Sequence, residues 1–307
     1  MTKVSVVVAT YNHASLIDEA LASVFAQETD FETEVIISED ASTDGTRQIV
    51  ELWHARYPDK TRLLLSDRNL HCNEVVARGF HAARGDYITL LDGDDYWTSP
   101  NKLAKQAATL DSDPSLSLCF HNARVSSGTT PHGDLWTDPA LSPRLTLADL
   151  WEGNPFPTCG SMFRRSALSR IPQWYSCITS MITDWPLYLL FAEQGDIAFI
   201  PESWGIYRLH ASGAFSPQSG KAKLASMDAL YRLVNEGMEG RHDASLRLGH
   251  HRYFVGMGRD FLSRGEPDLA LTAFGYAWRY RAGIHSKRHL NLLHLAVRAR
   301  MSMALSQ

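Results

Sequence analysis

Short apolar runs alternate with longer amphipathic segments through the N-terminal part of the chain. Runs rich in aliphatic and β-branched side chains, typical of strands buried on both faces, lie at 4–9, 34–38, 62–65, 87–92 and 116–125. Apolar residues recur at helical spacing in the segments between them, at about 15–25, 46–57 and 73–83. This alternation predicts a parallel, doubly wound α/β sheet.

The sequence also predicts helix starts, a long loop and several later elements. Ser15 is expected to cap the first helix with Asp18 in a capping-box position, and Ser99-Pro100 is expected to open a later one. A segment rich in Gly, Pro, Thr and Asp at 126–143 predicts a long functional loop. Additional strands or helices are expected at 158–164, 184–193 and 196–201. Residues 204–210 are expected to lead out of the sheet.

The pattern becomes helical throughout from about residue 218. Residues 252–264 and 267–281 predict a helical hairpin that resembles a single tetratricopeptide-like unit, which must pack on a neighbour to bury its face. A basic amphipathic helix is expected at 286–303. It either docks on neighbouring helices, which is the simpler interpretation, or makes peripheral contact with an anionic membrane. We therefore predict an α/β domain over 1–215 and a helical extension over 216–307.

Composition excludes some classes of protein. The 307 residues are 44% hydrophobic and 21% charged, and the formal net charge of -4 argues against non-specific binding to nucleic acid. The four cysteines form no C-x-x-C pair, which favours free thiols over a zinc or redox motif. The run at 4–9 is too short for a secretion signal, and no run approaches the ~20 residues of a membrane span. We expect a cytoplasmic protein.

Three carboxylates follow the apolar run at 87–92. Asp92, Asp94 and Asp95 stand at the carboxyl end of the predicted strand, where open α/β sheets bind their ligands. Clustered acids at this position suit a hard divalent cation that carries a phosphate ligand. Along an extended segment Asp92 and Asp94 point the same way, so we predict Asp92 on the ribose or sugar and Asp94 on the metal. The alternative is an ordinary polar turn.

The turns after the first two strands carry groups suited to a nucleotide. Tyr11 offers a flat surface for the base, Asp40 can accept a hydrogen bond from a base N–H, and Thr10 and Asn12 add polar contacts. Taken singly, each of these residues is better explained by turn chemistry. Residues 42–44 are assigned to the cap of the following helix, because they stand where a cap belongs.

Two later positions are also candidates. Asp184 starts an apolar helix, where it either complements the helix dipole, as physical reasoning alone favours, or serves as a general base toward an acceptor hydroxyl. His210 could bind a metal through a neutral ring nitrogen, and Arg208 could contact phosphate. A lone histidine is more often structural, so neither role follows from the residues alone.

Taken in this order, the segments resemble the inverting glycosyltransferases of family 2, which have the GT-A fold. Residues 4–12 resemble the family's opening strand and nucleotide turn, and residues 36–46 resemble its second motif. Residues 83–95 resemble the segment that holds its D-x-D motif. Together these motifs cover about the first hundred residues, and beyond about Phe215 the resemblance ends.

Two more variable motifs complete the resemblance. Asp184-Trp185 resembles the base motif, with Thr183 in place of the usual glutamate, and Tyr207-Arg208-x-His210 resembles a later motif. The resemblance therefore implies that Asp184 is the general base. It suggests His210 as a metal ligand.

The family implies a Rossmann-like, doubly wound mixed sheet that binds a nucleotide-sugar donor, here expected to be a UDP-sugar. The resemblance implies a donor nucleotide at Tyr11 and Asp40 and Mn²⁺ or Mg²⁺ on Asp94. The implied reaction is a single displacement by a hydroxyl of a saccharide or glycolipid acceptor, with inversion, in surface polysaccharide or glycoconjugate biosynthesis. Asp184 would deprotonate that hydroxyl.

Two other functions are weighed against this one. A phosphatase or nucleotidyltransferase could use the same acids, but residues 95–97 lack the small position of an aspartyl phosphatase and residues 10–13 are no glycine-rich phosphate loop. The second is an interaction protein built on the helical hairpin, with a vestigial nucleotide-binding domain. Metal-dependent binding of nucleotide would separate a transferase from such a protein.

Overall fold

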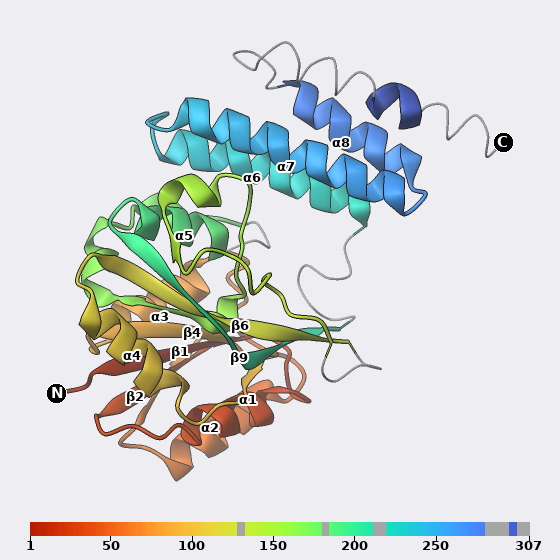
Figure 1. The fold of residues 1–307 in the computed structure, drawn as a ribbon. Helices are drawn as coiled ribbons and strands as arrows, with labels where there is room; N and C mark the ends of the chain where they lie inside the picture. The colour runs from red at the N-terminus through yellow and green to blue at the C-terminus, as the bar shows by residue number, and fades with distance from the viewer. Residues whose placement is uncertain (128–132, 180–183, 211–218, 280–294, 300–307) are drawn as a thin grey trace. The chain divides into compact units, whose positions relative to one another are not determined.

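The structure, a computed structural model, describes residues 1–127, 133–179, 184–210, 219–279 and 295–299. The chain divides into two compact units (Figure 1). The sheet unit holds Met1–Leu147, Asn154–Thr179 and the described part of Thr183–Ser216. The helical unit holds Ala148–Gly153 and the described part of Pro217–Gln307.

One nine-stranded mixed sheet forms the centre of the sheet unit within the described residues. Its strands are β1 (Val4–Thr10), β2 (Thr33–Glu39), β3 (Thr61–Leu65), β4 (Tyr87–Asp92), β5 (Tyr96–Trp97), β6 (Leu116–Ser127), β7 (Arg144–Leu145), β8 (Ser161–Arg164) and β9 (Asp196–Leu209). The order is β3-β2-β1-β4-β8-β6-β9-β5, and β7 pairs with β9. Strands β1 to β4 are parallel, but β8 is antiparallel to β4 and β6. The α/β prediction and the mixed sheet are confirmed, whereas a wholly parallel sheet is wrong.

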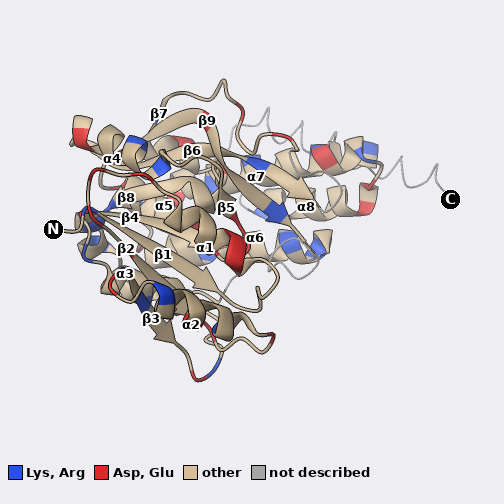
Figure 2. Cartoon of the chain, turned by 90° about the horizontal axis from the view of Figure 1, so that it is seen from below, with Lys and Arg blue, Asp and Glu red and all other residues tan. Residues whose placement is uncertain are grey.

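Helices cover both faces of this sheet, which explains why its central strands are apolar throughout. Val6 and Val8 of β1 join the core with side chains of α1 (Ile17–Phe25), α2 (Thr46–Arg56) and α4 (Lys102–Ser112). Val7 points to the other face, against α3 (Glu74–Ala82). Gly79 permits this contact, because an added Cβ would lie 2.5 Å from Val7 Cγ1. Figure 2 shows β1 without charged residues, in agreement with its sequence.

Two details of the first and fourth helices differ from prediction. Helix α1 begins at Ile17 after Leu16, and no side chain caps it, so the capping role of Ser15 is wrong. Asp18 instead accepts a hydrogen bond from Trp53 Nε1 (2.9 Å) on α2. Helix α4 begins at Lys102, later than Ser99-Pro100. Such shifts are expected, because local patterns locate helix ends only to within a turn.

The last strand of the sheet, β9, is longer than the sequence predicted. Residues 204–209 do not leave the sheet, because β9 continues as one strand to Leu209 and stays paired in parallel with β6. The long partner β6 supplies hydrogen-bonding groups as far as Ser127, so β9 can extend beyond residue 201. His210 consequently lies directly after the last residue of β9.

The predicted loop at 126–143 is described except for residues 128–132. Its later part runs beside β6, because Val125 N–H donates to Asp134 O (2.9 Å) and Trp136 N–H donates to Ala123 O (2.9 Å). Asn122 holds the same segment from the strand, donating to Thr137 O (2.7 Å) and accepting from Thr137 N–H (3.0 Å). The segment around Trp136 is therefore anchored to the sheet.

The helical unit contains α6 (Gly220–Gly237), α7 (Asp243–Ser263) and α8 (Pro267–Arg279). Helices α7 and α8 form the predicted hairpin, and Gly258 permits their contact because an added Cβ would lie 2.2 Å from Phe274 Cε1. Buried Asp228 ties the three helices together through His250 Nε2 (2.9 Å) and Arg279 Nη1 (3.0 Å).

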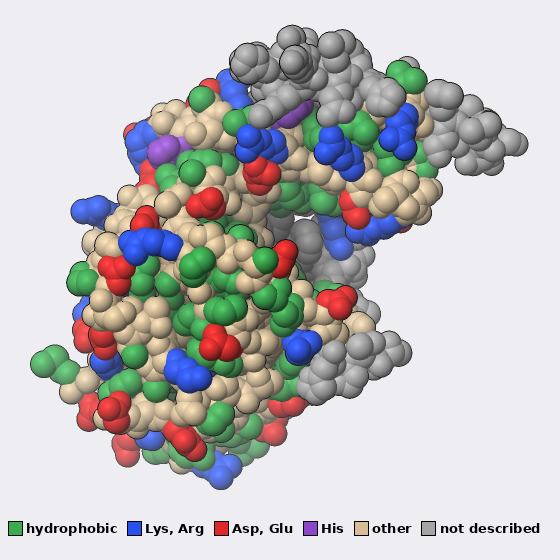
Figure 3. All heavy atoms as spheres, viewed as in Figure 1, with side chains coloured by type: hydrophobic (Ala, Val, Ile, Leu, Met, Phe, Trp, Pro, Cys, Tyr) green, Lys and Arg blue, Asp and Glu red, His purple; other side chains and the backbone are tan. Residues whose placement is uncertain are grey.

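Most of the basic helix expected at 286–303 lies outside the described residues. Residues 295–299 are helical, and Arg298 is exposed. Its contact with a membrane stays a prediction. Among the described helices, none has the length and apolar character needed to cross a bilayer. On the face drawn in Figure 3, acidic and basic side chains are interspersed over the described surface.

Candidate active site

The turns after β1, β2 and β4 lie at one edge of the sheet. These strands are adjacent and parallel, with Thr10 opposite Glu39 and Ala9 opposite Asp92. Gly93 N–H donates to Ala9 O (2.8 Å), and Asp40 N–H donates to Thr10 O (3.0 Å). The candidate nucleotide turns and the acid cluster therefore share one strand-end edge.

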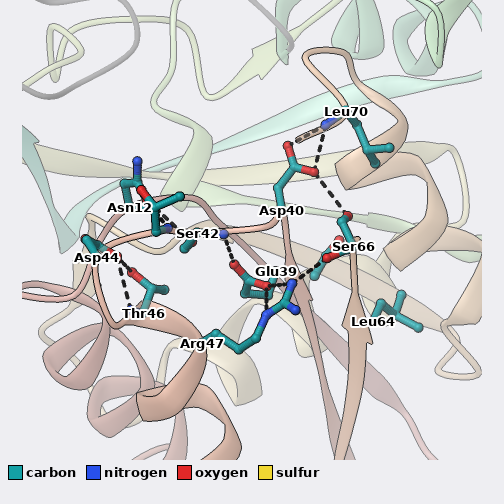
Figure 4. A network of polar contacts seen from close by, with 12 residues as sticks. Asn12, Glu39, Asp40, Ser42, Asp44, Thr46, Arg47, Leu64, Ser66 and Leu70 are labelled. Carbon is teal, nitrogen blue, oxygen red and sulfur yellow. Dashed lines mark hydrogen bonds and ion pairs between the residues drawn. The ribbon is translucent and has the colours of Figure 1, made fainter. Parts of the chain in front are cut away.

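Asn12 joins the first two turns to each other (Figure 4). Its N–H donates to Ser42 Oγ (2.9 Å), and its Oδ1 accepts from Thr43 N–H (2.8 Å). Asn12 and Ala41 both have the left-handed backbone, with φ of 55° and 60°. Non-glycine residues in this conformation cost free energy and cluster at functional sites. Contact between Asn12 and a nucleotide stays a prediction.

Asp40 lies in the same network, and its side chain is buried (Figure 4). Its Oδ1 accepts from Ser66 Oγ (3.1 Å) and Leu70 N–H (3.0 Å). A carboxylate has about four acceptor positions, so these donors leave capacity for a base N–H. Tyr11 is 40% exposed, which leaves its ring accessible. The assignment of Asp40 and Tyr11 to the donor nucleotide stays a prediction.

The second turn is held by two carboxylates. Asp44 Oδ1 accepts from Thr46 N–H (3.1 Å) and its Oδ2 accepts from Ala14 N–H (3.0 Å). The N-cap of α2 is Gly45, so the helix cap predicted at 42–44 lies one residue later than expected. Glu39 is fully buried and accepts from Arg47 Nε (2.7 Å) and Ser42 N–H (2.5 Å). Sequence reasoning missed Glu39, because nothing in the local pattern shows that Arg47 turns back onto it.

Four acids crowd the end of β4. Burial, followed by repulsion from Asp94 and Asp184, raises the pKa of Asp92 to about 8. Burial also raises the pKa of Asp95, with Asp94 and Asp92 adding to the effect, and burial raises the pKa of Asp184. Uncompensated negative charge of this kind fits a bound divalent cation, which would relieve the repulsion.

Asp94 is the acid that faces two histidines. Its Oδ2 lies 2.9 Å from His210 Nε2 and 3.7 Å from His13 Nε2. Among the described residues, no three His, Cys, Asp or Glu side chains form a preassembled metal site. A cation here would therefore draw ligands from phosphate and water as well, as Mg²⁺ commonly does.

Asp95 holds the end of β9 in place. Its Oδ1 accepts from Arg208 N–H (2.9 Å), and Arg208 Nη1 donates to Asp94 O (2.8 Å). The Arg208 guanidinium also pairs with Glu19 and lies over the Tyr96 ring. These contacts hold the Arg208 guanidinium in place, and its contact with phosphate stays a prediction. They also position His210, which follows two residues later.

Asp184 is held by a polar network at the start of α5 (Asp184–Ala192). Its Oδ2 accepts from Asn154 Nδ2 (2.5 Å) and Thr158 Oγ1 (3.1 Å), and its Oδ1 accepts from Trp185 N–H (2.8 Å). Sequence reasoning missed Asn154 and Thr158, because their contact with Asp184 depends on tertiary packing. The network fixes the carboxylate, as a general base requires.

Replacing Asp92 by asparagine should stabilise the metal-free protein. The pKa of the Asp92 carboxyl is about 8, above the ordinary value near 3.9, and asparagine cannot take up the negative charge that Asp92 acquires as pH rises. The native state then binds more protons than the unfolded state, so the wild-type free energy of unfolding falls as pH rises from about 4 to 8. We expect Asp92→Asn to raise the melting temperature by about 2–4 °C at pH 8 and by less at pH 5.

Scanning fluorimetry in a buffer that contains a metal chelator would measure the melting temperatures of Asp92→Asn and wild type. A lower melting temperature at pH 8 would contradict it.

The mixed sheet, with the acid cluster at its strand-end edge, has the GT-A fold. The family model described as "Glycosyl transferase family 2" matches residues 5–171. The chain therefore belongs to glycosyltransferase family 2. An uncharacterized protein of Mycobacterium tuberculosis is 36% identical over 244 residues, which cover 75% of this chain and 68% of that protein.

Solved structures share this fold. One is Staphylococcus aureus TarS 1–349 in complex with UDP-GlcNAc, with TM-score 0.66, 20% identity and coverage of 98% of this chain and 89% of that one. Another is the mannosyltransferase PcManGT from Pyrobaculum calidifontis in complex with GDP-Man and Mn²⁺, with TM-score 0.60, 21% identity and coverage of 99% and 80%. At this identity the similarity concerns the fold.

Proposed function

We propose that this protein is an inverting, metal-dependent glycosyltransferase that moves a sugar from a nucleoside-diphosphate donor, a UDP-sugar, to a hydroxyl of a saccharide or glycolipid. The observation that carries the proposal is that two acids are held by different partners, one suited to bind a cation and the other to act as a base. The Asp94 carboxylate lies beside His210, where the two side chains could bind a cation. The Asp184 carboxylate accepts hydrogen bonds from Asn154 and Thr158. Surface polysaccharide or glycoconjugate biosynthesis is the pathway we propose.

The donor would occupy the strand-end edge. Tyr11, Thr10, Asn12 and Asp40 would contact the nucleotide, and Asp92 would contact the ribose or transferred sugar. Asp94 and His210 would hold Mn²⁺ or Mg²⁺, and the bound ion would neutralise charge on the leaving diphosphate. The complexes of TarS with UDP-GlcNAc and of PcManGT with GDP-Man and Mn²⁺ support this class of donor and ion.

Asp184 would take the proton from the acceptor hydroxyl as that oxygen attacks the anomeric carbon. Burial raises the pKa of Asp184, so the carboxylate is a stronger base than an ordinary aspartate. Asn154 and Thr158 would orient it toward the hydroxyl. One base suffices for a single displacement, so the anomeric configuration would invert.

An aromatic pair supports a saccharide acceptor. Trp136 is 37% exposed, and its ring packs at 4.6 Å against Tyr207 with an interplanar angle of 61°. Burial raises the pKa of Tyr207, and the charges of Asp95 and Asp92 add to the rise. Thr137, next to Trp136, donates to Pro155 O (2.7 Å), one residue from Asn154. The exposed indole would give the apolar face of a sugar ring a surface near Asp184.

Trp136→Ala is expected to weaken the acceptor without affecting the donor. Loss of the indole should raise the KM for a saccharide acceptor about tenfold, equivalent to ~1.4 kcal/mol. The KM for the donor and its slow hydrolysis in the absence of acceptor should stay near wild type. Initial rates at varied acceptor and at varied donor measure the two separately. An equal change in both KM values would count against an acceptor surface at Trp136.

A donor panel tests the proposed function. The protein would be incubated with UDP- and GDP-sugars and Mn²⁺, with release of nucleoside diphosphate as the readout. We expect release from one class of donor, dependent on the metal and accelerated by a saccharide acceptor. NMR of the product would show the inverted anomeric configuration. Retained configuration would refute a single displacement, and no metal-dependent nucleotide binding by calorimetry would favour an interaction protein instead.

A further inference from the structure

We propose that His13 is a third protein ligand of the cation at Asp94, and that the resulting His–Asp–His donor set favours Mn²⁺ and related transition ions over Mg²⁺. This inference rests on the proposed function, which places a cation on Asp94 and His210. His13 follows the nucleotide turn directly and has no role in the reaction as proposed so far. The proposed role of His13 is to determine which ion the site prefers.

The three side chains come from different strand ends and meet at one carboxylate oxygen. His210 Nε2 and His13 Nε2 lie 2.9 Å and 3.7 Å from Asp94 Oδ2, and the two rings are nearly perpendicular with centroids 6.3 Å apart. With bonds of about 2.1 Å, two ligand atoms of one ion lie about 3.0 Å apart at right angles and about 4.2 Å apart when opposite. Both observed separations lie close to or within this range, so small side-chain rotations would suffice.

The His13 ring is already held for this role. Its Nδ1 lies 3.2 Å from Thr10 Oγ1, which leaves Nε2 directed toward Asp94. Metal-binding histidines commonly use the second ring nitrogen in this way, which fixes the tautomer and the ring orientation. The backbone is anchored too, because His13 N–H donates to Thr46 Oγ1 (2.8 Å) and His13 O accepts from Ile17 N–H (2.8 Å).

Gly93, between the two acids of the D-x-D motif, makes room for this ring. A Cβ added at Gly93 would lie 2.9 Å from His13 Nδ1 and 2.6 Å from Thr10 Oγ1. Both distances are too short to tolerate without displacement. The glycine therefore permits the close approach of Thr10 and His13 to the acid-bearing turn.

The site is open enough for an ion to enter. The side chains of His13, Asp94 and His210 are 14%, 19% and 20% exposed. Imidazole nitrogens suit transition ions, whereas Mg²⁺ prefers carboxylate, phosphate and water oxygens. A site with two imidazole ligands and one carboxylate ligand should therefore prefer Mn²⁺ to Mg²⁺.

Metal binding to the whole protein with UDP tests the inference. We expect His13→Gln, which keeps the reach of the side chain but offers an amide, to weaken Mn²⁺ binding about 10–100-fold in calorimetry or EPR titration. Mg²⁺ binding should change much less, so the preference for Mn²⁺ narrows. Gly93→Ala should act in the same direction. His81→Gln, which removes an exposed histidine of α3, is the matched control and should match wild type.

Pulsed EPR of wild-type protein with Mn²⁺ and UDP gives a result that does not depend on a variant folding. Two coordinated imidazole nitrogens are expected, and a single one would overturn the role of His13. If His13→Gln keeps the wild-type preference while Asp94→Ala loses Mn²⁺, the inference fails and the proposed function stands. If Asp94→Ala also binds Mn²⁺ as wild type does, the metal assignment in the proposed function fails.

Discussion

Asp184→Asn is expected to lower kcat about 10³-fold while leaving the affinity for the donor near wild type. Asparagine keeps the size of the side chain but cannot accept the proton of an acceptor hydroxyl. The amide oxygen can still accept from Asn154 Nδ2 and Thr158 Oγ1, as Asp184 Oδ2 does. The amide NH2 then faces Trp185 N–H, so only one of the three hydrogen bonds is lost and the fold should survive. Steady-state transfer rates, together with calorimetric binding of UDP, would measure the two effects separately.

The pH dependence of wild-type transfer adds a second check on Asp184. A general base must be unprotonated, so activity should fall as pH drops through the pKa of Asp184. Burial raises that pKa, which places the acid limb above the value near 3.9 of an exposed aspartate. Asp184→Asn should remove this limb from its residual activity.

A matched substitution separates loss of the base from general damage. Asp86 is exposed, so Asp86→Asn makes the same chemical change away from the site and should leave kcat unchanged. Asn154→Ala should lower kcat less than Asp184→Asn does, because it frees the carboxylate without removing it. Turnover by Asp184→Asn close to the wild-type rate would exclude Asp184 as the base.

Asp94→Ala is expected to lower kcat/KM about 10³-fold and to remove the dependence on Mn²⁺. The substitution deletes the carboxylate whose Oδ2 lies 2.9 Å from His210 Nε2. The main chain should stay in place, because Arg208 Nη1 donates to the Asp94 carbonyl rather than to its side chain. Rates of nucleoside diphosphate release at increasing Mn²⁺ would measure the loss.

Two comparisons make the Asp94 result interpretable. Asp86→Ala removes an exposed acid and should keep the wild-type response to Mn²⁺. His210→Ala should weaken the metal response by about 10–100-fold, less than Asp94→Ala, because the carboxylate remains. Release of nucleotide by Asp94→Ala as fast as by wild type would remove Asp94 from the metal site.

The order of strands and acids along the chain was sufficient to predict the class of fold. Val4–Thr10 and Tyr87–Asp92 are apolar until they end in polar residues, and parallel neighbours bring such ends to one edge. The structure confirms this arrangement. The antiparallel course of β8 could not be predicted, because a run of four residues carries no information about its direction.

Local pattern failed where a residue's partner lies far along the chain. Trp204–Leu209 continues β9 because β6 pairs with it, and that pairing joins residues about eighty positions apart. Asp95 had no predictable role, since its partner is the N–H of Arg208. Asn154 and Thr158 meet Asp184 only through packing around the start of α5.

The sequence by itself determined the alternation of elements, the strand-end positions of Thr10, Asp40 and Asp92, and the resemblance to family 2. All three features follow from local periodicity and short motifs, which can be recognised without knowing any tertiary contact. The tertiary structure alone decided which acids face histidines and which are held by neighbours. That outcome depends on distances between strand ends, such as His13 and His210 around Asp94, which no spacing along the chain encodes.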